Sequence, residues 1–256
     1  MTGSIDYAHI ADLYDTFVKT DFDVAFFLKE SQSVSGEVLE LTSGTGRLSL
    51  PLIEAGVRLT CVDQSAEMLS VLRENLAARK LCAPIHQADM CHFSLGKKFD
   101  LIIIPFNAFA ELTSLADQHD TLTCVRQHLS DTGRFICTLH NPSVRLKRVD
   151  GQLRLWGKFP LDNDQGVLLL LGLENLDPSG NTVSGLEFFE EYDKEGKMRA
   201  KRLLEIHFSL PEKQRFEERI AAAGFKPVAL YGDYSCAPFQ EDTSPAMIWV
   251  LQKTQF

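Results

Sequence analysis

Three acidic side chains in the first half of the chain are spaced so that they can hold parts of one ligand. Glu40 lies in an apolar run just before a glycine turn, Asp63 ends the next apolar run, and Asp89 ends the one after that. A carboxylate at the end of a second strand can accept both hydrogen bonds of a ribose diol. One on the following strand can meet an adenine amino group. Taken singly, each acid can equally cap a helix or lie in a solvated loop; taken together, they favour a cationic adenosine cofactor without phosphates.

The glycine turn lies in the stretch VLELTSGTGRLSLPLIEAG, residues 38–56. A tight glycine turn between a strand and a helix is a common nucleotide site. A dinucleotide fingerprint needs three glycines in GxGxxG; Gly44 and Gly46 fit the first two places, but Ser49 occupies the third. A nicotinamide-dependent oxidoreductase is therefore disfavoured, and it would leave Asp89 without a role.

The elements that position these residues alternate between strands and helices. Strands are predicted in the runs EVLEL, RLTCVD, PIHQAD, FDLIIIPF and GRFICTLHNP. Helices are predicted between them, including one over residues 65–80 with Ser65 as its N-cap and one over residues 115–129. Short buried strands alternating with helices predict a parallel, doubly wound sheet with right-handed crossovers.

The pattern changes near Asn141. The runs QLRLWGKF, GVLLLLGLENLD, TVSGLEFFEEYD and MRAKRLLEIHFSL have no helices between them, and the turns DPSGN and DKEGK separate the last three. These features predict an antiparallel insertion of meander type. After the insertion we predict an N-capped amphipathic helix that ends at Gly224, followed by two closing strands, KPVALYGDY and PAMIWVLQK. Two helices are predicted near the N-terminus, between Ile5 and Lys29.

Composition narrows the class of partner. The 256 residues are 45% hydrophobic, enough for one substantial core with or without a smaller appendage. A net charge of -9 is a poor match to nucleic acid or an anionic membrane, so a small-molecule partner is expected. The six scattered cysteines contain no CxxC pair and indicate free thiols in a reducing compartment, with no metal site. No signal peptide or span-length apolar run is evident, so we expect a cytoplasmic protein without membrane contact.

These features together resemble the class I S-adenosylmethionine-dependent methyltransferases of small-molecule type. The family's first motif is similar to VLELTSGTGRLSLPL, its ribose acid to Asp63 in LTCVDQSAEML, its adenine-edge acid to Asp89 in ADM, and its fourth-strand motif to FDLIIIPFNAFAEL. The resemblance covers about residues 38–139 and the closing runs AAGFKPVALYGDY and SPAMIWVLQK.

The resemblance implies an α/β fold: a Rossmann-like seven-stranded sheet with its last strand antiparallel, helices on both faces, and the antiparallel β insertion. The expected domains are an N-terminal helical lid at 1–36, a cofactor-binding core at 37–142 and 209–256, and the insertion at 143–208. The insertion would cover the acceptor, form the interface of a homodimer, or do both.

The implied cofactor is S-adenosyl-L-methionine, released as S-adenosyl-L-homocysteine. Backbone around the glycine turn would approach its methionine part, Asp63 would hold the ribose, and Asp89 with the Met90 amide would read the adenine edge. The residues expected to contact it are Tyr14, Glu40, Thr42, Gly44, Gly46, Arg47, Asp63, Gln64, Met68, Asp89, Met90, Pro105 and Phe106.

Thr42 departs from the family pattern, which usually has glycine at this place. We expect Thr42 to keep a β conformation, because Gly44 and Gly46 remain where the backbone must come closest. Its hydroxyl is expected to help hold the turn or the cofactor. The departure bears on affinity rather than on cofactor identity.

Methyl transfer from a sulfonium is an in-line displacement, in which an enzyme mainly positions the nucleophile and excludes water. A base is optional for an amine and usually needed for a hydroxyl. His140 is the first candidate base, with a loop histidine bonded to backbone as the alternative, and Tyr7 is the second catalytic candidate. The expected acceptor contacts are Asn107, Phe109, Trp156 and Tyr231, with a helix N-cap as the alternative role of Asn107.

The segment IPFNAF lacks the Asn or Asp, two prolines and aromatic residue that often mark methyltransferases acting on nucleic-acid or protein amide nitrogens. The predicted function is therefore methyl transfer to a nitrogen or oxygen of a small molecule. An NAD-dependent oxidoreductase and a non-catalytic protein that binds the adenosine ligand are the alternatives.

Overall fold

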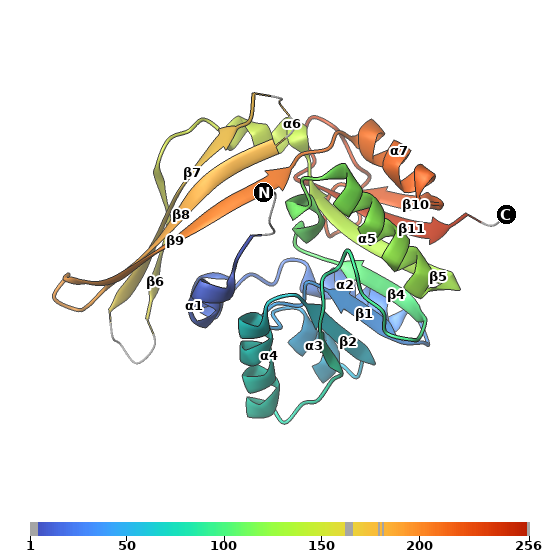
Figure 1. Ribbon diagram of the computed structural model, residues 1–256, viewed down its shortest axis with the longest axis horizontal. Coiled ribbons are helices and arrows are strands. Elements are labelled where there is room, and N and C mark those ends of the chain that lie inside the picture. The colour runs from blue at the N-terminus through green and yellow to red at the C-terminus, as the bar shows by residue number, and fades with distance from the viewer. Residues whose placement is uncertain (1–4, 162–165, 179, 181, 255–256) are drawn as a thin grey trace.

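The computed structural model describes residues 5–161, 166–178, 180 and 182–254. Two sheets lie side by side in it, one of seven strands and one of four (Figure 1). The four-stranded sheet extends away from the rest of the molecule as a long, curved blade.

The seven-stranded sheet has the order β10-β11-β5-β4-β1-β2-β3. Strands β1 to β5 are parallel, and β11 runs antiparallel to both of its neighbours, β5 and β10. This order confirms the predicted fold class. The strands are β1 Val38–Leu41, β2 Leu59–Asp63, β3 Ile85–Gln87, β4 Phe99–Ile104, β5 Leu129–His140, β10 Phe225–Tyr231 and β11 Ala246–Lys253.

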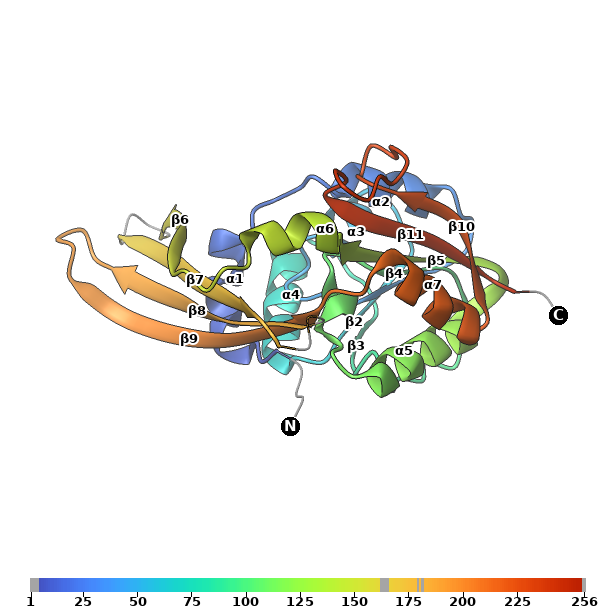
Figure 2. The same ribbon diagram turned by 90° about the horizontal axis from the view of Figure 1, so that it is seen from above.

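Helices cover both faces of this sheet (Figure 2). The side chains of β4 alternate between the two faces, so that Leu101 and Ile103 pack with α2, α3 and α4, whereas Ile102 and Ile104 pack with α5 and α7. This period of two is what a strand buried on both faces requires. The helices are α2 Val24–Gln32, α3 Ser49–Glu54, α4 Ala66–Ala78, α5 Leu115–His128 and α7 Lys213–Ala222.

The N-terminal caps of two helices can be compared with those predicted from the sequence. Ser65 caps α4 as predicted, since its side chain accepts a hydrogen bond from the Met68 amide. The predicted side-chain cap of α7 is wrong: Glu212 occupies the N-cap position and its side chain makes no cap bond. Ser, Thr, Asp and Asn are favoured at this place because their short side chains set an oxygen beside the amides of the first turn, and the Glu side chain is longer.

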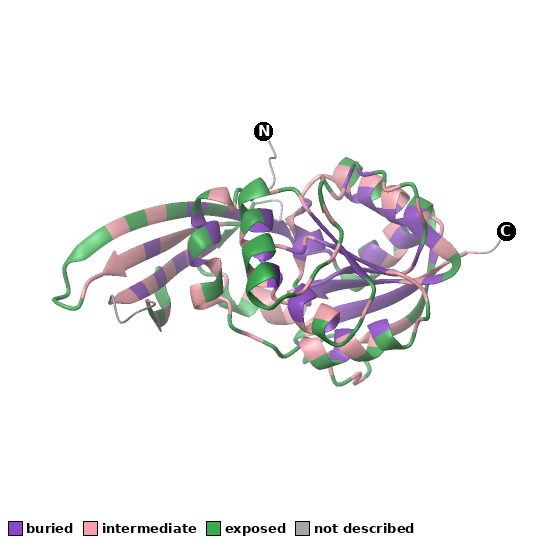
Figure 3. Ribbon diagram, turned by 90° about the horizontal axis from the view of Figure 1, so that it is seen from below, coloured by how far each residue is buried: buried purple, intermediate pink, exposed green. Residues whose placement is uncertain are grey.

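The four-stranded sheet, called the cap sheet below, is an antiparallel meander of β6 Arg154–Pro160, β7 Val167–Leu176, β8 Thr182–Tyr192 and β9 Met198–Ser209. The predicted turn DKEGK joins β8 to β9, with the Asp193 amide bonded to the Lys197 carbonyl. Ser179 and Asn181 of the predicted turn DPSGN lie outside the described residues. Figure 3 shows that burial is concentrated in the seven-stranded sheet, whereas much of the blade is exposed.

Short helical segments connect these parts. Near the N-terminus, η1 Ala8–Ile10 and α1 Ala11–Phe17 lie beside the cap sheet, and η2 Ala108–Glu111 follows β4. A connection of α6 Pro142–Arg145 and η3 Leu146–Arg148 leads from β5 toward the cap sheet. The predicted domain limits, at 36/37, 142/143 and 208/209, stay predictions. Among the described helices, none is long and apolar enough to cross a membrane.

Candidate active site

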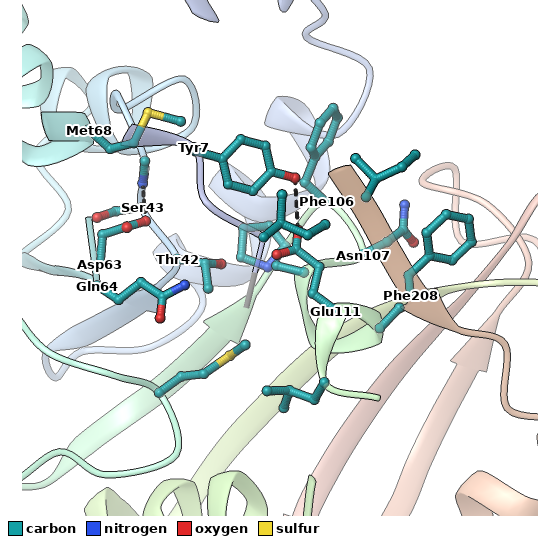
Figure 4. A pocket seen from close by; sticks show the side chains of 18 of the residues that line it. Tyr7, Thr42, Ser43, Asp63, Gln64, Met68, Phe106, Asn107, Glu111 and Phe208 are labelled. Carbon is teal, nitrogen blue, oxygen red and sulfur yellow. Dashed lines mark hydrogen bonds between the residues drawn. The ribbon is translucent and has the colours of Figure 1, made fainter. Parts of the chain in front are cut away.

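A cavity of about 690 Å³ lies between the carboxyl edge of the seven-stranded sheet and the cap sheet. One wall comes from the glycine turn and from the segments that follow β2, β3 and β4. The opposite wall comes from the cap sheet and includes Trp156, Glu174, Glu187 and Phe208. Figure 4 shows side chains from both walls. The parallel strands converge at this edge, so residues distant in sequence meet there.

The glycine turn is tighter than the sequence indicates. Thr42 has a φ of 63°, which places it in the left-handed region, so the predicted β conformation is wrong. The following amide, that of Ser43, still bonds to the Val62 carbonyl of β2, so the left-handed residue lies within the stretch that is held against β2. The Thr42 hydroxyl donates to the Leu41 carbonyl and so holds the turn, one of its two expected roles.

Gly46 lies behind the turn and does not line the cavity, although it was expected to contact the cofactor. A Cβ at this position would come within 2.4 Å of a Leu72 methyl group. The φ of Gly46 is 97°, a conformation that favours glycine, so the backbone and the packing of α4 against the turn both suit glycine at this place. Gly44 does line the cavity, and among the described residues no atom lies within 4 Å of the Cβ position at Gly44, apart from its immediate chain neighbours.

Asp63 is fixed at the end of β2 by two backbone bonds. Its Oδ2 accepts from the Gly44 amide at 2.8 Å and its Oδ1 from the Ser65 amide at 2.9 Å. Burial raises the pKa of Asp63, and these hydrogen bonds act in the opposite direction. Because two backbone amides hold the carboxylate in place, it is preorganised toward the cavity that it lines.

Asp89 lies just beyond β3, on the same side of the cavity. Its Oδ1 accepts from the Cys91 amide at 2.8 Å, which orients the carboxylate in the loop. Gln64, Met68 and Met90 line the cavity near it. The structure thus brings together the residues that were expected to hold ribose and adenine.

Glu40 and Arg47 line the cavity, but their polar atoms are bonded elsewhere. Ser49 Oγ donates to Glu40 Oε2 at 2.6 Å. Burial, partly opposed by this bond, raises the pKa of Glu40 to about 8. The Arg47 guanidinium binds both carboxylate oxygens of Asp23, at 2.6 and 2.7 Å, and lies 4.5 Å from the centre of the Phe106 ring.

A pair of residues in the middle of the cavity joins the N-terminal segment to η2. The Tyr7 hydroxyl donates to Glu111 Oε1 at 3.1 Å (Figure 4). The Tyr7 ring packs edge-on against Tyr14, with 6.1 Å between the ring centres. Burial, with smaller contributions from neighbouring carboxylates that include Glu187, raises the pKa of Glu111 to about 8 despite the Tyr7 bond. Burial likewise raises the pKa of Glu187, on β8, to about 7.

Glu111 and Glu187 were not identified from the sequence. Glu111 belongs to the run FNAFAEL, which was noted only for its likeness to a fourth-strand motif. Glu187 shares the strand alternation of Val183 and Phe189, which are buried on the same face of β8. An acid in the same register as two buried apolar side chains of the strand was therefore the signal available.

The remaining candidates divide into two groups. His140, Trp156 and Asn107 line the cavity, as do Pro105 and Phe106. His140 lies against the Phe208 ring, and burial together with Arg145 lowers its pKa to about 4, so it is neutral near pH 7. Asn107 occupies the N-cap position of η2, as its alternative role had it, but its side chain makes no cap bond. Its Oδ1 is buried without a hydrogen-bond partner among the described residues.

Two expected acceptor contacts lie away from the cavity. Phe109 is fully buried and packs edge-on against Phe216 of α7 at 5.5 Å. Tyr231 ends β10 and packs against Phe26 of α2 at 6.3 Å. Neither lines the cavity, which corrects their assignment as substrate contacts. In both cases the ring fills a gap between helix and sheet.

Helix α1 is bonded to both walls of the cavity. Asp15 accepts from Thr45 Oγ1 of the glycine turn at 2.5 Å and from Asn75 of α4 at 2.9 Å. On the other side, Asp12 accepts from Arg202 of β9 at 2.9 Å. The helix thus spans from the turn to the cap sheet.

Residues 38–133 match the family profile described as "Methyltransferase domain". A putative methyltransferase, YqeM, of Bacillus subtilis is 23% identical over 94% of this chain and 92% of its own length. A glycine/sarcosine N-methyltransferase of Halorhodospira halochloris is 30% identical, but the match spans only about half of each chain. A solved structure described as an S-adenosylmethionine-dependent methyltransferase from Clostridium acetobutylicum superposes with a TM-score of 0.80 at 18% identity, covering 97% of this chain and 99% of that one.

The matched domain and the sheet order define a class I methyltransferase fold. Residues 38–133 thus carry a methyltransferase domain, and the chain as a whole has the fold of the solved S-adenosylmethionine-dependent methyltransferase. The residues present fit this cofactor: besides the two fixed carboxylates, Ser43 Oγ is buried at the turn without a hydrogen-bond partner among the described residues.

Proposed function

We propose that this chain transfers the methyl group of S-adenosylmethionine to an amino nitrogen of a small molecule. The observation that carries the proposal is the pair of inward-facing carboxyl groups, Glu111 and Glu187, in the cavity that begins at the glycine turn. The two arginines of the cavity, Arg47 and Arg145, are already paired with Asp23 and Glu174. The cavity therefore has an excess of carboxyl groups, which suits an acceptor that arrives as an ammonium ion.

On this proposal Asp63 accepts the ribose hydroxyls, and Asp89 with the Met90 amide meets the adenine edge. Gln64 and Met68 flank the adenine. Ser43, Thr42 and Gly44 lie toward the methionine part, with Tyr14, Pro105 and Phe106 around the sulfonium. Glu40 and Arg47 support the turn from behind, because their polar atoms are engaged by Ser49 and Asp23.

When bound, the cofactor supplies an electrophilic methyl group for in-line displacement. The work of the protein is to bring a neutral amine against that methyl. Glu111 accepts a proton from the ammonium, which frees the nitrogen lone pair to form the new carbon–nitrogen bond as the carbon–sulfur bond breaks. A pKa of about 8 leaves the Glu111 carboxyl mostly protonated at pH 7 in the free protein, and the positive charge of an arriving ammonium ion lowers that pKa, so that the ionised form becomes available to accept the proton.

Tyr7 positions the base. Its hydroxyl holds Glu111 Oε1, and its ring closes the cavity together with Tyr14. His140 lines the same cavity and is the second candidate for the proton, although a pKa of about 4 makes it a weaker proton acceptor than Glu111. Trp156 and Asn107 complete the acceptor side. Exclusion of water by the aromatic rings strengthens the electrostatic interactions inside.

The cofactor is tested by calorimetric titration with S-adenosylhomocysteine and, in parallel, NAD, on the wild type and on Asp63→Asn. We expect the homocysteine compound to bind the wild type and to bind the variant at least about tenfold more weakly, since the amide loses one charge-assisted acceptor. Binding of NAD alone would overturn the cofactor.

The acceptor class is tested by incubating the enzyme with labelled cofactor and panels of small amines and phenols. We expect label to enter amines, and Glu111→Gln to lower kcat with a changed pH profile while homocysteine-compound binding stays near wild type. Transfer to phenols alone would overturn the choice of nitrogen. Tight cofactor binding with no transfer to any acceptor would favour a non-catalytic binding protein.

We also infer that the chain works in the cytoplasm, without nucleic acid, either as a monomer or as a homodimer. The net charge of -9 and the six free cysteines support this inference. Light scattering of the purified protein measures the oligomeric state. Titration with an oligonucleotide measures nucleic-acid binding.

A further inference from the structure

A second cavity, of about 680 Å³, adjoins the first and has the opposite charge. It lies between the α6–η3 connection and the strands β6 and β7, and we call it the basic groove. It shares Arg145, Trp156 and Glu174 with the cavity of the active site. Its charged lining consists of four cations and one carboxylate: Arg145, Lys147, Arg148, Arg154 and Glu174. Such a concentration stands out in a chain whose net charge is -9.

Much of this positive charge is not neutralised by the protein. Lys147 and Arg148 are exposed and form no ion pair with any residue that the structure describes. Arg154 pairs with Asp150, but both side chains are more than two-fifths exposed, and such a pair is easily exchanged for another anion. Only Arg145 is held firmly, by Glu174 and by the face of Phe208. The groove thus offers cations to an anion from outside.

Trp156 stands where the two cavities join. The pairing of β6 with β7 shifts register between Leu155 and Gly157, so Trp156 occupies a bulge. Bulges re-aim a side chain relative to its strand. The indole lies across Gly172 of β7, where a Cβ would come within 2.4 Å of the ring, and yet 41% of Trp156 is exposed. The bulge and the glycine together present one indole face at the junction.

We propose that the acceptor carries an anionic group, a phosphate or a carboxylate, which binds in the basic groove while a ring of the acceptor lies against Trp156. This inference rests on the proposed function, because it places the amine of the same molecule beside Glu111. The carboxyl groups of one cavity and the cations of the next then select opposite ends of one zwitterionic substrate. Arginine and lysine side chains are the usual partners of both anions.

The experiment is a fluorescence titration of the full chain. The protein has two tryptophans, and Trp249 is fully buried, so quenching by a ligand in the groove reports on Trp156. The probes are phenyl phosphate, benzoate and the neutral benzyl alcohol, and Trp156→Phe shows how much of the signal belongs to this residue. The groove variant is Lys147→Ala/Arg148→Ala. The matched control, Lys213→Ala/Arg215→Ala, removes the same charge from the exposed face of α7.

We expect one or both anionic probes to quench the wild type, and the dissociation constant to rise about tenfold in the groove variant but not in the control. The comparison of phenyl phosphate with benzoate identifies the anion. Equal binding of benzyl alcohol, or equal binding by wild type and groove variant, would overturn the inference. Each preparation is also titrated with S-adenosylhomocysteine. Failure of the wild type in that titration counts against the proposed function, whereas success there with no anion binding counts against the groove alone.

Discussion

Ser49 Oγ donates a hydrogen bond of 2.6 Å to Oε2 of Glu40, and both residues are buried behind the glycine turn. Ser49 stands at the place where a dinucleotide fingerprint has its third glycine. That glycine allows close packing of helix on strand. Here the same position instead supplies a donor to an acid on β1, so helix α3 and strand β1 are joined by a polar bond.

This pair predicts a large loss of stability for one substitution and a small change for another. Ser49→Ala should lower the free energy of unfolding by about 1–3 kcal/mol, because it leaves a buried carboxyl oxygen without its donor. Glu40→Gln should change it much less at pH 7, since burial raises the pKa of Glu40 to about 8 and the carboxyl is already mostly neutral. Urea denaturation of the two variants measures both values. A loss as large in Glu40→Gln as in Ser49→Ala would show that the carboxyl is ionised.

Thr42 predicts a difference between two substitutions that both remove its hydroxyl. A β-branched residue at a φ of 63° carries strain of about 1–2 kcal/mol, whereas glycine costs roughly 0.5–1 kcal/mol in backbone entropy. Thr42→Val and Thr42→Gly lose the same hydrogen bond to the Leu41 carbonyl, but only Thr42→Gly relieves the strain. Thr42→Val should therefore melt at a lower temperature than the wild type and than Thr42→Gly. Calorimetric melting of both variants measures this difference; a melting temperature of Thr42→Gly at or below that of Thr42→Val would contradict the strain.

The ion pair of Arg47 with Asp23 predicts a large loss of stability. Asp23 is fully buried and Arg47 has only 13% of its side chain exposed. Arg47→Ala should destabilise the fold by about 3–5 kcal/mol, because it strands a buried charge. The control is Arg79→Ala, whose pair with Glu54 is nearly half exposed and should cost less than about 1 kcal/mol. Denaturation measures the free energy of unfolding of both variants. Similar losses in the two would contradict a buried charge on Asp23.

The buried acids predict how stability changes with pH. Burial raises the pKa values of Glu40 and Glu111 to about 8 and that of Glu187 to about 7. Between the ordinary carboxyl pKa and these values the folded state binds more protons than the unfolded state, so stability is greatest at low pH in this window and falls as pH rises.

The melting temperature of the ligand-free protein should therefore fall between about pH 5 and pH 9, by a few degrees per acid. Glu111→Gln should flatten the decline, whereas Glu217→Gln, on the exposed face of α7, should leave it unchanged. Melting curves across this pH range test both variants. An identical slope in wild type and Glu111→Gln would mean that Glu111 is not titrating there.

The sequence predicted most of the elements but only part of the site. Period-two apolar runs and the turn DKEGK were enough for the cap sheet, and strand ends were enough to bring Asp63 and Asp89 to one edge. The conformation of Thr42 could not be predicted, because it depends on the register of β1 against β2. Glu111 and Glu187 come from segments that meet only when the cap sheet folds back, which no local pattern encodes.

The contacts of α1 also bear on the order of events in a catalytic cycle. The helix is bonded through Asp15 to the glycine turn and through Asp12 to β9. An outward movement of the helix would break the bonds on both sides at once. A route past α1 for the methyl donor and for the methylated product would therefore open both ends of the cavity to solvent together.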